Sequence, residues 1–269
     1  MSEALAHNLE EDWQPKRLAA NAGIAFVGIN VKANAASAKT GNFLLTADTF
    51  LFPKYKIAED GFEDLIYDKG VTVVKNYIPV DLKDSLKRYS AFIVTPRKHC
   101  HIPIFARIDN KFHNIIPDDS VIVLASKYCA HLGVLYSVFY SVWHEYHCSL
   151  LKTESDYDPM EIFETFPFPE ELTQQMAHDG QTISDKYSLF CIYNEVGLVE
   201  AYKKIEVGVN IEPSFKNIKN TKDILNQELA QYYKLPIKYL NNKEKIISLL
   251  LTENKKRELR RTEWVRIQN

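Results

Sequence analysis

Tyr157-Asp158-Pro159-Met160-Glu161-Ile162-Phe163-Glu164-Thr165-Phe166-Pro167-Phe168-Pro169 is the most distinctive stretch of a chain of 269 residues. Three phenylalanines and three prolines fall within it, in an order that matches neither a helix period nor a strand period. Each proline fixes its own φ and moves the preceding residue away from the helical region. This stretch, the Phe/Pro segment, is therefore predicted to be stiff and extended and to pack against neighbouring helices. The alternative is that its rings stack on bases, as in proteins that bind single strands.

A long apolar and aromatic run leads into the Phe/Pro segment. Between Tyr128 and Tyr146 the apolar residues recur at helical spacing, which predicts one helix with a wide apolar face. Further upstream, apolar and β-branched runs bounded by turn residues predict short strands. They lie at residues 24–29, 42–46, 71–78, 91–95, 102–108 and 120–125, the last as a buried strand. Short helices are expected near Trp13 to Ala20 and, capped by Thr46, from there to Phe52.

Behind the Phe/Pro segment the periodicity is helical. Residues 183–199 predict one helix, and after a loop at 211–220 the stretches 222–233 and 243–256 predict a helix pair. A β-rich front and a helical tail indicate an α+β protein. The expected organisation is a polar lead-in (1–20), a mixed β-rich domain (21–175) and a small helical C-terminal domain (176–269).

Charge is segregated along the chain, although the formal net charge is only −2. Residues 75–111 carry 8 Lys/Arg against 3 Asp/Glu, and residues 203–269 carry 15 against 8. The remaining segments are acidic, with 7 against 10 in residues 1–74 and 3 against 14 in residues 112–202. Two basic segments in a nearly neutral protein predict a positive surface for a polyanion. For residues 203–269 a solvated helical surface, with its last cations near a helix C-terminus, is the alternative.

The composition indicates a globular protein and gives no sign of a membrane partner. Apolar residues make up 46% and charged residues 25%, and no apolar run approaches the roughly 18 residues of a membrane span. The first eleven residues are acidic and polar, unlike a secretory signal. Four cysteines lie far apart without CxxC spacing, which favours reduced thiols. We therefore expect a cytoplasmic protein.

Arg97, Lys98 and His99 form a basic tripeptide between two predicted strands, within the segment 75–111. An arginine at a loop tip can pair bidentately with guanine, and a lysine can neutralise a phosphate. Further candidates for the same DNA-binding face are Lys75, Arg107 and Lys111. A solvated turn is the alternative for the tripeptide.

Histidines also raise the question of a metal site. His99 and His101 would share one face of a strand, because alternate residues point to the same side. His144 and His147, however, are spaced i, i+3 and not i, i+4 as in a zinc-protease helix. We therefore expect core or surface histidines and no metal site.

Several strings of the sequence follow one another in an order and spacing that resemble one family. They are Phe26-Val27-Gly28, Asn42-Phe43-Leu44-Leu45-Thr46, Val73-Val74-Lys75-Asn76-Tyr77-Ile78 with Asp81-Leu82, Ile93-Val94-Thr95-Pro96-Arg97-Lys98-His99, Pro117-Asp118-Asp119-Ser120-Val121-Ile122, Leu132-Gly133-Val134-Leu135-Tyr136-Ser137 with Val142-Trp143, the Phe/Pro segment, Ile192-Tyr193-Asn194-Glu195 and Leu225 to Leu235. Together they resemble the C-terminal half of type II-G and type II-L adenine-specific DNA methyltransferases, which are fused restriction–modification enzymes, and of related phage-defence methyltransferases.

The resemblance implies a DNA target recognition domain followed by a helical C-terminal region, with double-stranded DNA as the partner. The catalytic half of that family carries a glycine-containing S-adenosylmethionine loop and an N-P-P-Y or D-P-P-Y loop that holds the flipped adenine. Neither motif occurs in this sequence, and the nearest string is Asn76-Tyr77-Ile78-Pro79. The chain is therefore expected to be a fragment, inactive by itself, with S-adenosylmethionine bound by a separate N-terminal methyltransferase polypeptide.

Two alternatives to DNA recognition remain open from the sequence. In the first, the chain is a degenerate remnant or a protein-interaction subunit, which binds a partner through its acidic middle without touching DNA. In the second, it is a small metal-dependent enzyme built on the histidines.

Overall fold

The computed structural model describes twelve stretches of the chain. They are residues 13–22, 24–27, 43–45, 54–57, 63–66, 91–98, 103–109, 115–117, 119–125, 130–150, 157–207 and 213–268. The predicted strand at 71–78 and the predicted helix from Thr46 to Phe52 lie outside these residues.

A four-stranded antiparallel sheet forms the centre of the fold. Its strands are β1 (Ala25–Val27), β8 (Val121–Leu124), β5 (Ala91–Pro96) and β6 (Ala106–Asp109), in this spatial order. All four side chains of β8 are fully buried, as the unbroken apolar run predicts for a strand covered on both faces. The sheet and the helices described below confirm the predicted α+β class.

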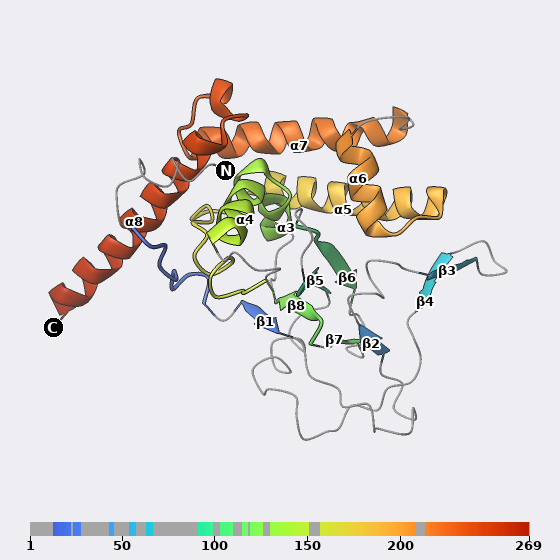
Figure 1. Cartoon of the computed structure of the whole chain (residues 1–269), viewed down its shortest axis with the longest axis horizontal. Helices are drawn as coiled ribbons and strands as arrows, with labels where there is room; N and C mark the ends of the chain where they lie inside the picture. The colour runs from blue at the N-terminus through green and yellow to red at the C-terminus, as the bar shows by residue number, and fades with distance from the viewer. Residues whose placement is uncertain are drawn as a thin grey trace, which may run out of the picture.

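Two smaller ladders accompany the central sheet. Strand β2 (Phe43–Leu45) pairs in parallel with β7 (Ile115–Pro117). Strand β3 (Lys54–Ile57) pairs antiparallel with β4 (Glu63–Ile66), and Figure 1 shows this pair at the margin of the molecule.

The helix predicted between Tyr128 and Tyr146 is two helices, α3 (Ala130–Leu135) and α4 (Val138–Leu150). Ser137 separates them, because its hydroxyl accepts a hydrogen bond from the Tyr140 amide and caps the start of α4. The Val138 amide, left without an intrahelical partner, donates to the Asn226 side chain at 2.9 Å. The prediction of one helix was therefore wrong, since apolar periodicity continues through a break that a single serine caps.

Four long helices follow the Phe/Pro segment. They are α5 (Gln174–Asn194), α6 (Leu198–Val207), α7 (Pro213–Tyr232) and α8 (Lys243–Gln268), with a short turn η3 (Ile237–Tyr239) before α8. Figure 1 shows α5, α6 and α7 together beside the sheet, and α8 inclined away from them. The helix pair is confirmed, but the loop prediction was wrong for residues 213–220, which belong to α7. Helix α7 begins at Pro213, a residue well suited to a first helical position.

Helices α3 and α5 touch through their backbones at Gly133. A Cβ atom built on this glycine would lie 2.3 Å from the carbonyl oxygen of Met176, well inside van der Waals contact. Only a residue without a side chain lets the two helices approach this closely.

The Phe/Pro segment is only partly extended. Asp158 accepts a hydrogen bond from the Met160 amide at 2.8 Å, and the Ile162 amide donates to the Asp158 carbonyl at 2.9 Å. Residues 159–165 therefore form consecutive turns of helical type, whereas residues 157–158 and 167–169 lack turn structure. The prediction of a wholly extended segment was wrong in its first half, because Asp-Pro is itself a helix start in which proline occupies the first position. The predicted packing role is confirmed, since Phe163, Phe166 and Phe168 are buried.

The N-terminal segment 13–22 is not the predicted helix. It runs without regular structure as far as Leu18 and then turns. The fully buried side chain of Asn254, on α8, accepts from the Trp13 indole at 3.2 Å and from the Lys16 amide at 3.0 Å. It also donates to the carbonyls of Lys16 and Thr165 at 2.8 and 2.7 Å. This single amide thereby joins the N-terminal segment, the Phe/Pro segment and α8.

A continuous hydrophobic core connects sheet and helices. It extends from Phe92 on β5, through Trp143 on α4, to Leu250 on α8, and so crosses the boundary expected near residue 175. Within the part of the chain that the structure describes, no helix is long and apolar enough to cross a membrane.

Candidate nucleic-acid interface

Arg97 and Lys98 lie where strand β5 leaves the sheet. The Arg97 amide donates to the Ser120 carbonyl at 2.8 Å, and the Arg97 carbonyl accepts from the Tyr157 amide at 2.5 Å. The main chain is thus held on both sides, while the Arg97 side chain is half-buried and that of Lys98 is exposed. Five of the six residues of β5 are buried, and side chains at the end of such a strand are positioned by the rigid scaffold behind them.

Arg107, a further candidate for the same DNA-binding face, lies at a distance from Arg97. It lies inside β6, directly opposite Ile93 of β5, and its side chain is half-buried. Ile93 is four residues before Arg97 along β5, a separation of roughly 13 Å. The structure therefore does not bring Arg107 next to Arg97. If both residues contact DNA, the contact surface on the protein must extend over at least this distance.

Three of the predicted contact residues cannot be placed. Lys75, His99 and Lys111 lie outside the described residues. The geometry of the candidate interface accordingly rests on Arg97 and Lys98.

Three cations of the basic segment 203–269 are engaged by carboxylates or carbonyls of the same chain. Lys243 pairs with Glu145 of α4 at 2.6 Å, and Arg260 pairs with Glu170 at 3.1 Å. Arg257 donates to the Phe168 carbonyl. The acidic segment 112–202 and the basic segment 203–269 thus meet within the fold. These two ion pairs neutralise only part of the positive charge of residues 203–269, which carry 15 Lys/Arg.

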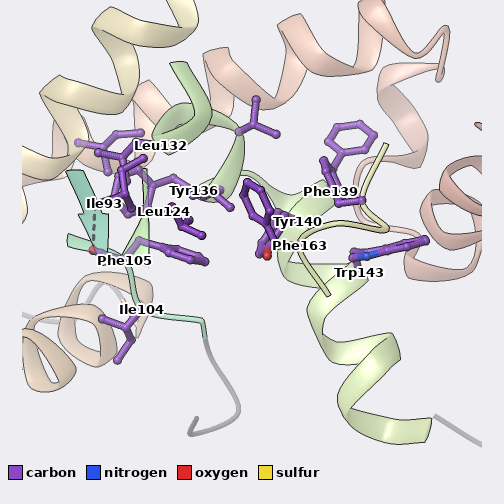
Figure 2. Close-up of a cluster of buried hydrophobic side chains, with 14 of the residues drawn as sticks. Ile93, Ile104, Phe105, Leu124, Leu132, Tyr136, Phe139, Tyr140, Trp143 and Phe163 are labelled. Carbon is purple, nitrogen blue, oxygen red and sulfur yellow. Dashed lines mark hydrogen bonds between the residues drawn. The ribbon is translucent and has the colours of Figure 1, made fainter. Parts of the chain in front are cut away.

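The aromatic residues of the Phe/Pro segment form core and not a stacking platform. The Phe166 ring lies 5.0 Å from that of Tyr140 and 6.0 Å from that of Trp143, both edge-to-face. The Trp143 indole donates to the Ile162 carbonyl at 3.1 Å. Figure 2 shows Tyr140 and Trp143 of α4 beside the Phe/Pro segment. Bases cannot reach rings buried this way without opening the core.

The histidines of α4 are core residues. His144 and His147 are buried, and burial lowers the pKa of each to about 4, with His144 lowering that of its neighbour further. Both are therefore neutral at pH 7. Among the described residues no group of three His, Cys, Asp or Glu side chains converges to hold a metal ion.

The fold defines an α+β protein in which helices cover an antiparallel sheet. No family model and no curated protein matches the chain. Among solved structures, the chain is similar to MmeI, a type IIL restriction–modification enzyme determined in complex with DNA, with a TM-score of 0.55 and 12% sequence identity. The match covers 92% of this chain, which spans 36% of the length of that protein. At this identity the similarity shows a shared fold.

Proposed function

We propose that the chain is the DNA target recognition part of an adenine-specific DNA methyltransferase from a restriction–modification or phage-defence system. The observation that carries the proposal is the fold similarity over 92% of the chain to a restriction–modification enzyme bound to DNA. The ordered sequence strings that resemble this enzyme class support it independently.

In this proposal Arg97 and Lys98 contact duplex DNA from the end of β5. The Arg97 backbone is fixed by hydrogen bonds to Ser120 and Tyr157, so that binding costs little backbone freedom at this residue. An arginine there can read guanine or hold a phosphate, and the exposed lysine can release a counterion. Lys75, His99, Arg107 and Lys111 are proposed as further contacts.

Methyl transfer is proposed to need a second polypeptide. The sequence holds neither the S-adenosylmethionine loop nor the adenine-binding loop of the resembled family. A separate N-terminal catalytic polypeptide would therefore bind S-adenosylmethionine and the flipped base, and this chain would select the site. We propose accordingly that the chain alone does not methylate.

A salt series with matched charge variants tests the DNA-binding part. Binding of the full chain to a fluorescein-labelled duplex is measured by anisotropy from low to moderate salt. The double variant Arg97→Ala/Lys98→Ala should bind more weakly, and its slope of log affinity against log salt should fall by about 1 to 2. The control Lys203→Ala/Lys219→Ala removes the same charge from α6 and α7, and its slope should stay within about 0.5 of the parent value.

Two outcomes contradict the proposal. No affinity at low salt, even with a catalytic polypeptide added, would leave a protein-interaction subunit as the better function. Equal weakening by both double variants would show a diffuse electrostatic attraction without a binding site at the end of β5.

A further inference from the structure

Two residues that are far apart in the sequence hold the backbone of Arg97. Ser120, which directly precedes β8, accepts from the Arg97 amide at 2.8 Å. Tyr157, the first residue of the Phe/Pro segment, donates to the Arg97 carbonyl at 2.5 Å. The direction in which the Arg97 side chain leaves the sheet therefore depends on how the start of β8 and the Phe/Pro segment lie relative to each other.

Asn21 joins the N-terminal segment to the Phe/Pro segment. The residue is only 4% exposed. Its side-chain amide donates to the carbonyls of Phe163, Glu164 and Phe166 at 3.3, 3.1 and 2.7 Å. The Leu18 amide adds a bond to the Glu164 carbonyl at 2.8 Å. Separating the two segments would leave the buried side-chain amide without acceptors, so Asn21 fixes the distance between them.

The other side of Asn21 is bonded towards the central sheet. The Asn21 carbonyl accepts from the Ile24 amide at 3.4 Å, and the Ile24 carbonyl accepts from the Ala125 amide at 2.8 Å. Ile24 leads directly into β1, and every residue of β1 is paired with β8. The N-terminal segment is thereby fixed to the strand that Ser120 precedes.

These bonds form a closed path around Arg97. From Arg97 the path runs through the Phe/Pro segment to Asn21, and it returns through β1 and β8. The turns inside the Phe/Pro segment are themselves bonded, because the Glu164 amide donates to the Pro159 carbonyl at 2.9 Å. A contact side chain keeps its geometry when the groups behind it are held by further hydrogen bonds. Asn21 is the residue at which the two halves of the path meet.

Helix α4 also holds the Phe/Pro segment, at other points. The Trp143 indole donates to the Ile162 carbonyl at 3.1 Å, and the hydroxyls of Tyr140 and Tyr157 are bonded to each other. These contacts attach the Phe/Pro segment to the helices. Asn21 attaches the same segment, through β1, to the sheet from which Arg97 projects.

We propose that Asn21 is a positioning residue for the DNA contact of Arg97. It touches no DNA itself. It sets the relation between the two attachments of the Arg97 backbone and thereby the direction of the guanidinium. The inference rests on the proposed function, because it takes Arg97 as a DNA contact, and it adds a buried, uncharged residue that the charge pattern of the sequence does not mark.

The variant Asn21→Ala tests the proposal in the full chain. It removes the side-chain amide that joins the two segments and leaves the backbone bonds in place. The variant is expected to fold, because each of the three carbonyls keeps a backbone donor. These donors are the amides of Phe166, Leu18 and Phe168 for the carbonyls of Phe163, Glu164 and Phe166.

Hydrogen exchange measures the positioning without DNA. In Asn21→Ala the amides of Arg97 and Tyr157 should exchange about three- to tenfold faster relative to the buried amides of β8. The ratio to β8 separates this local effect from a change in global stability. The control Thr173→Ala removes the hydroxyl that caps α5 by accepting from the Met176 amide at 3.0 Å, and it should not raise the ratio.

A double-variant cycle on DNA affinity tests whether Asn21 acts through Arg97. Asn21→Ala should weaken binding to the labelled duplex about three- to tenfold and lower the slope of log affinity against log salt by about 1. In the Arg97→Ala background it should cause no further weakening, because the side chain that it positions is absent. Thr173→Ala should leave the affinity unchanged in both backgrounds.

The positioning role is overturned if Asn21→Ala leaves the exchange ratio unchanged, or if Thr173→Ala raises it equally. It is also overturned if the ratio rises while DNA affinity stays at the parent value, or if Asn21→Ala weakens binding equally with and without the Arg97 side chain. A parent chain without affinity for duplex DNA would sink the proposed function, and this inference with it. A parent that binds DNA, with Asn21→Ala binding equally well, would sink the inference alone.

Discussion

The backbone N–H of Tyr157 donates a 2.5 Å hydrogen bond to the carbonyl oxygen of Arg97. The first residue of the Phe/Pro segment therefore holds the main chain of the principal DNA-contact candidate. On its other side the Arg97 amide donates to the Ser120 carbonyl. Because both contacts are made by backbone atoms, a change of the Arg97 side chain leaves them in place.

We therefore expect Arg97→Ala to separate binding from stability. The melting temperature should change by no more than about 2 °C, because the side chain is half-buried and its backbone contacts persist. The slope of log affinity against log salt for duplex DNA should fall by about 1. Arg97→Lys should keep that slope and lose any guanine preference, since a lysine cannot make the bidentate pair. A fall in melting temperature above about 5 °C would instead assign the side chain a structural role.

Gly133→Ala should destabilise the fold. The new Cβ would lie 2.3 Å from the Met176 carbonyl oxygen, so α3 and α5 must separate. Overpacking of this kind costs about 1 to 3 kcal/mol, measurable as the free energy of unfolding in urea. Ser188→Ala, at an exposed position of α5, is the control and should stay within about 0.5 kcal/mol. An unchanged midpoint for Gly133→Ala would show that the two helices are not in backbone contact.

Asn254→Ala should release the N-terminal segment. The substitution removes four hydrogen bonds at a fully buried position and leaves the Trp13 indole and the Lys16 amide without their acceptor. A loss of about 2 to 4 kcal/mol is expected, with faster hydrogen exchange of the Lys16 amide as the local sign. Thr252→Ala, at an exposed position of the same helix, should change neither quantity. Unchanged exchange at Lys16 in Asn254→Ala would contradict the joining role of this amide.

The protein should lose stability in mild acid through His144 and His147. Burial lowers the pKa of both to about 4 in the folded state, against an ordinary value of 6.5. The unfolded chain binds more protons between these values, so the stability contributed by the neutral histidines is complete above pH 6.5 and is lost as the pH falls towards 4. At pH 5 the combined loss should be about 2 to 4 kcal/mol in urea unfolding.

An exposed histidine provides the comparison for this pH dependence. His178→Gln should retain the full acid sensitivity, because that side chain is 73% exposed. His144→Gln should remove part of the sensitivity, whatever its effect on stability at neutral pH. A slope of stability against pH that is equal in the parent and in His144→Gln would refute the assignment.

Apolar patterns in the sequence predicted correctly an element that is buried on all sides. Strand β8 is a short apolar run, and burial on both faces is the arrangement that such a run favours. The sequence pattern does not reveal the break between α3 and α4, because the Asn226 side chain that accepts from the Val138 amide lies 88 residues further along the chain. The N-terminal segment was predicted wrongly for the same reason. The amide and carbonyl of Lys16 bond to the Asn254 side chain, and the Leu18 amide bonds to the Glu164 carbonyl, where a helix would pair such groups within the segment.

The candidate site could be predicted only as a local cluster. Arg97 and Lys98 are adjacent in sequence and lie at the end of one strand, so the structure keeps them together. The place of Arg107 depends on the register of β6 against β5, which charge spacing does not reveal.

The contact between Trp13 and Asn254 spans 241 residues, and this separation bears on how the protein folds. Contacts so distant in sequence form late, because the conformational entropy of the chain between them must be lost before the contact can stabilise the fold. Docking of the N-terminal segment therefore requires α8 to be in place against the Phe/Pro segment. In a refolding experiment, protection of the Lys16 amide would mark the last step, when the two ends of the described chain close upon each other.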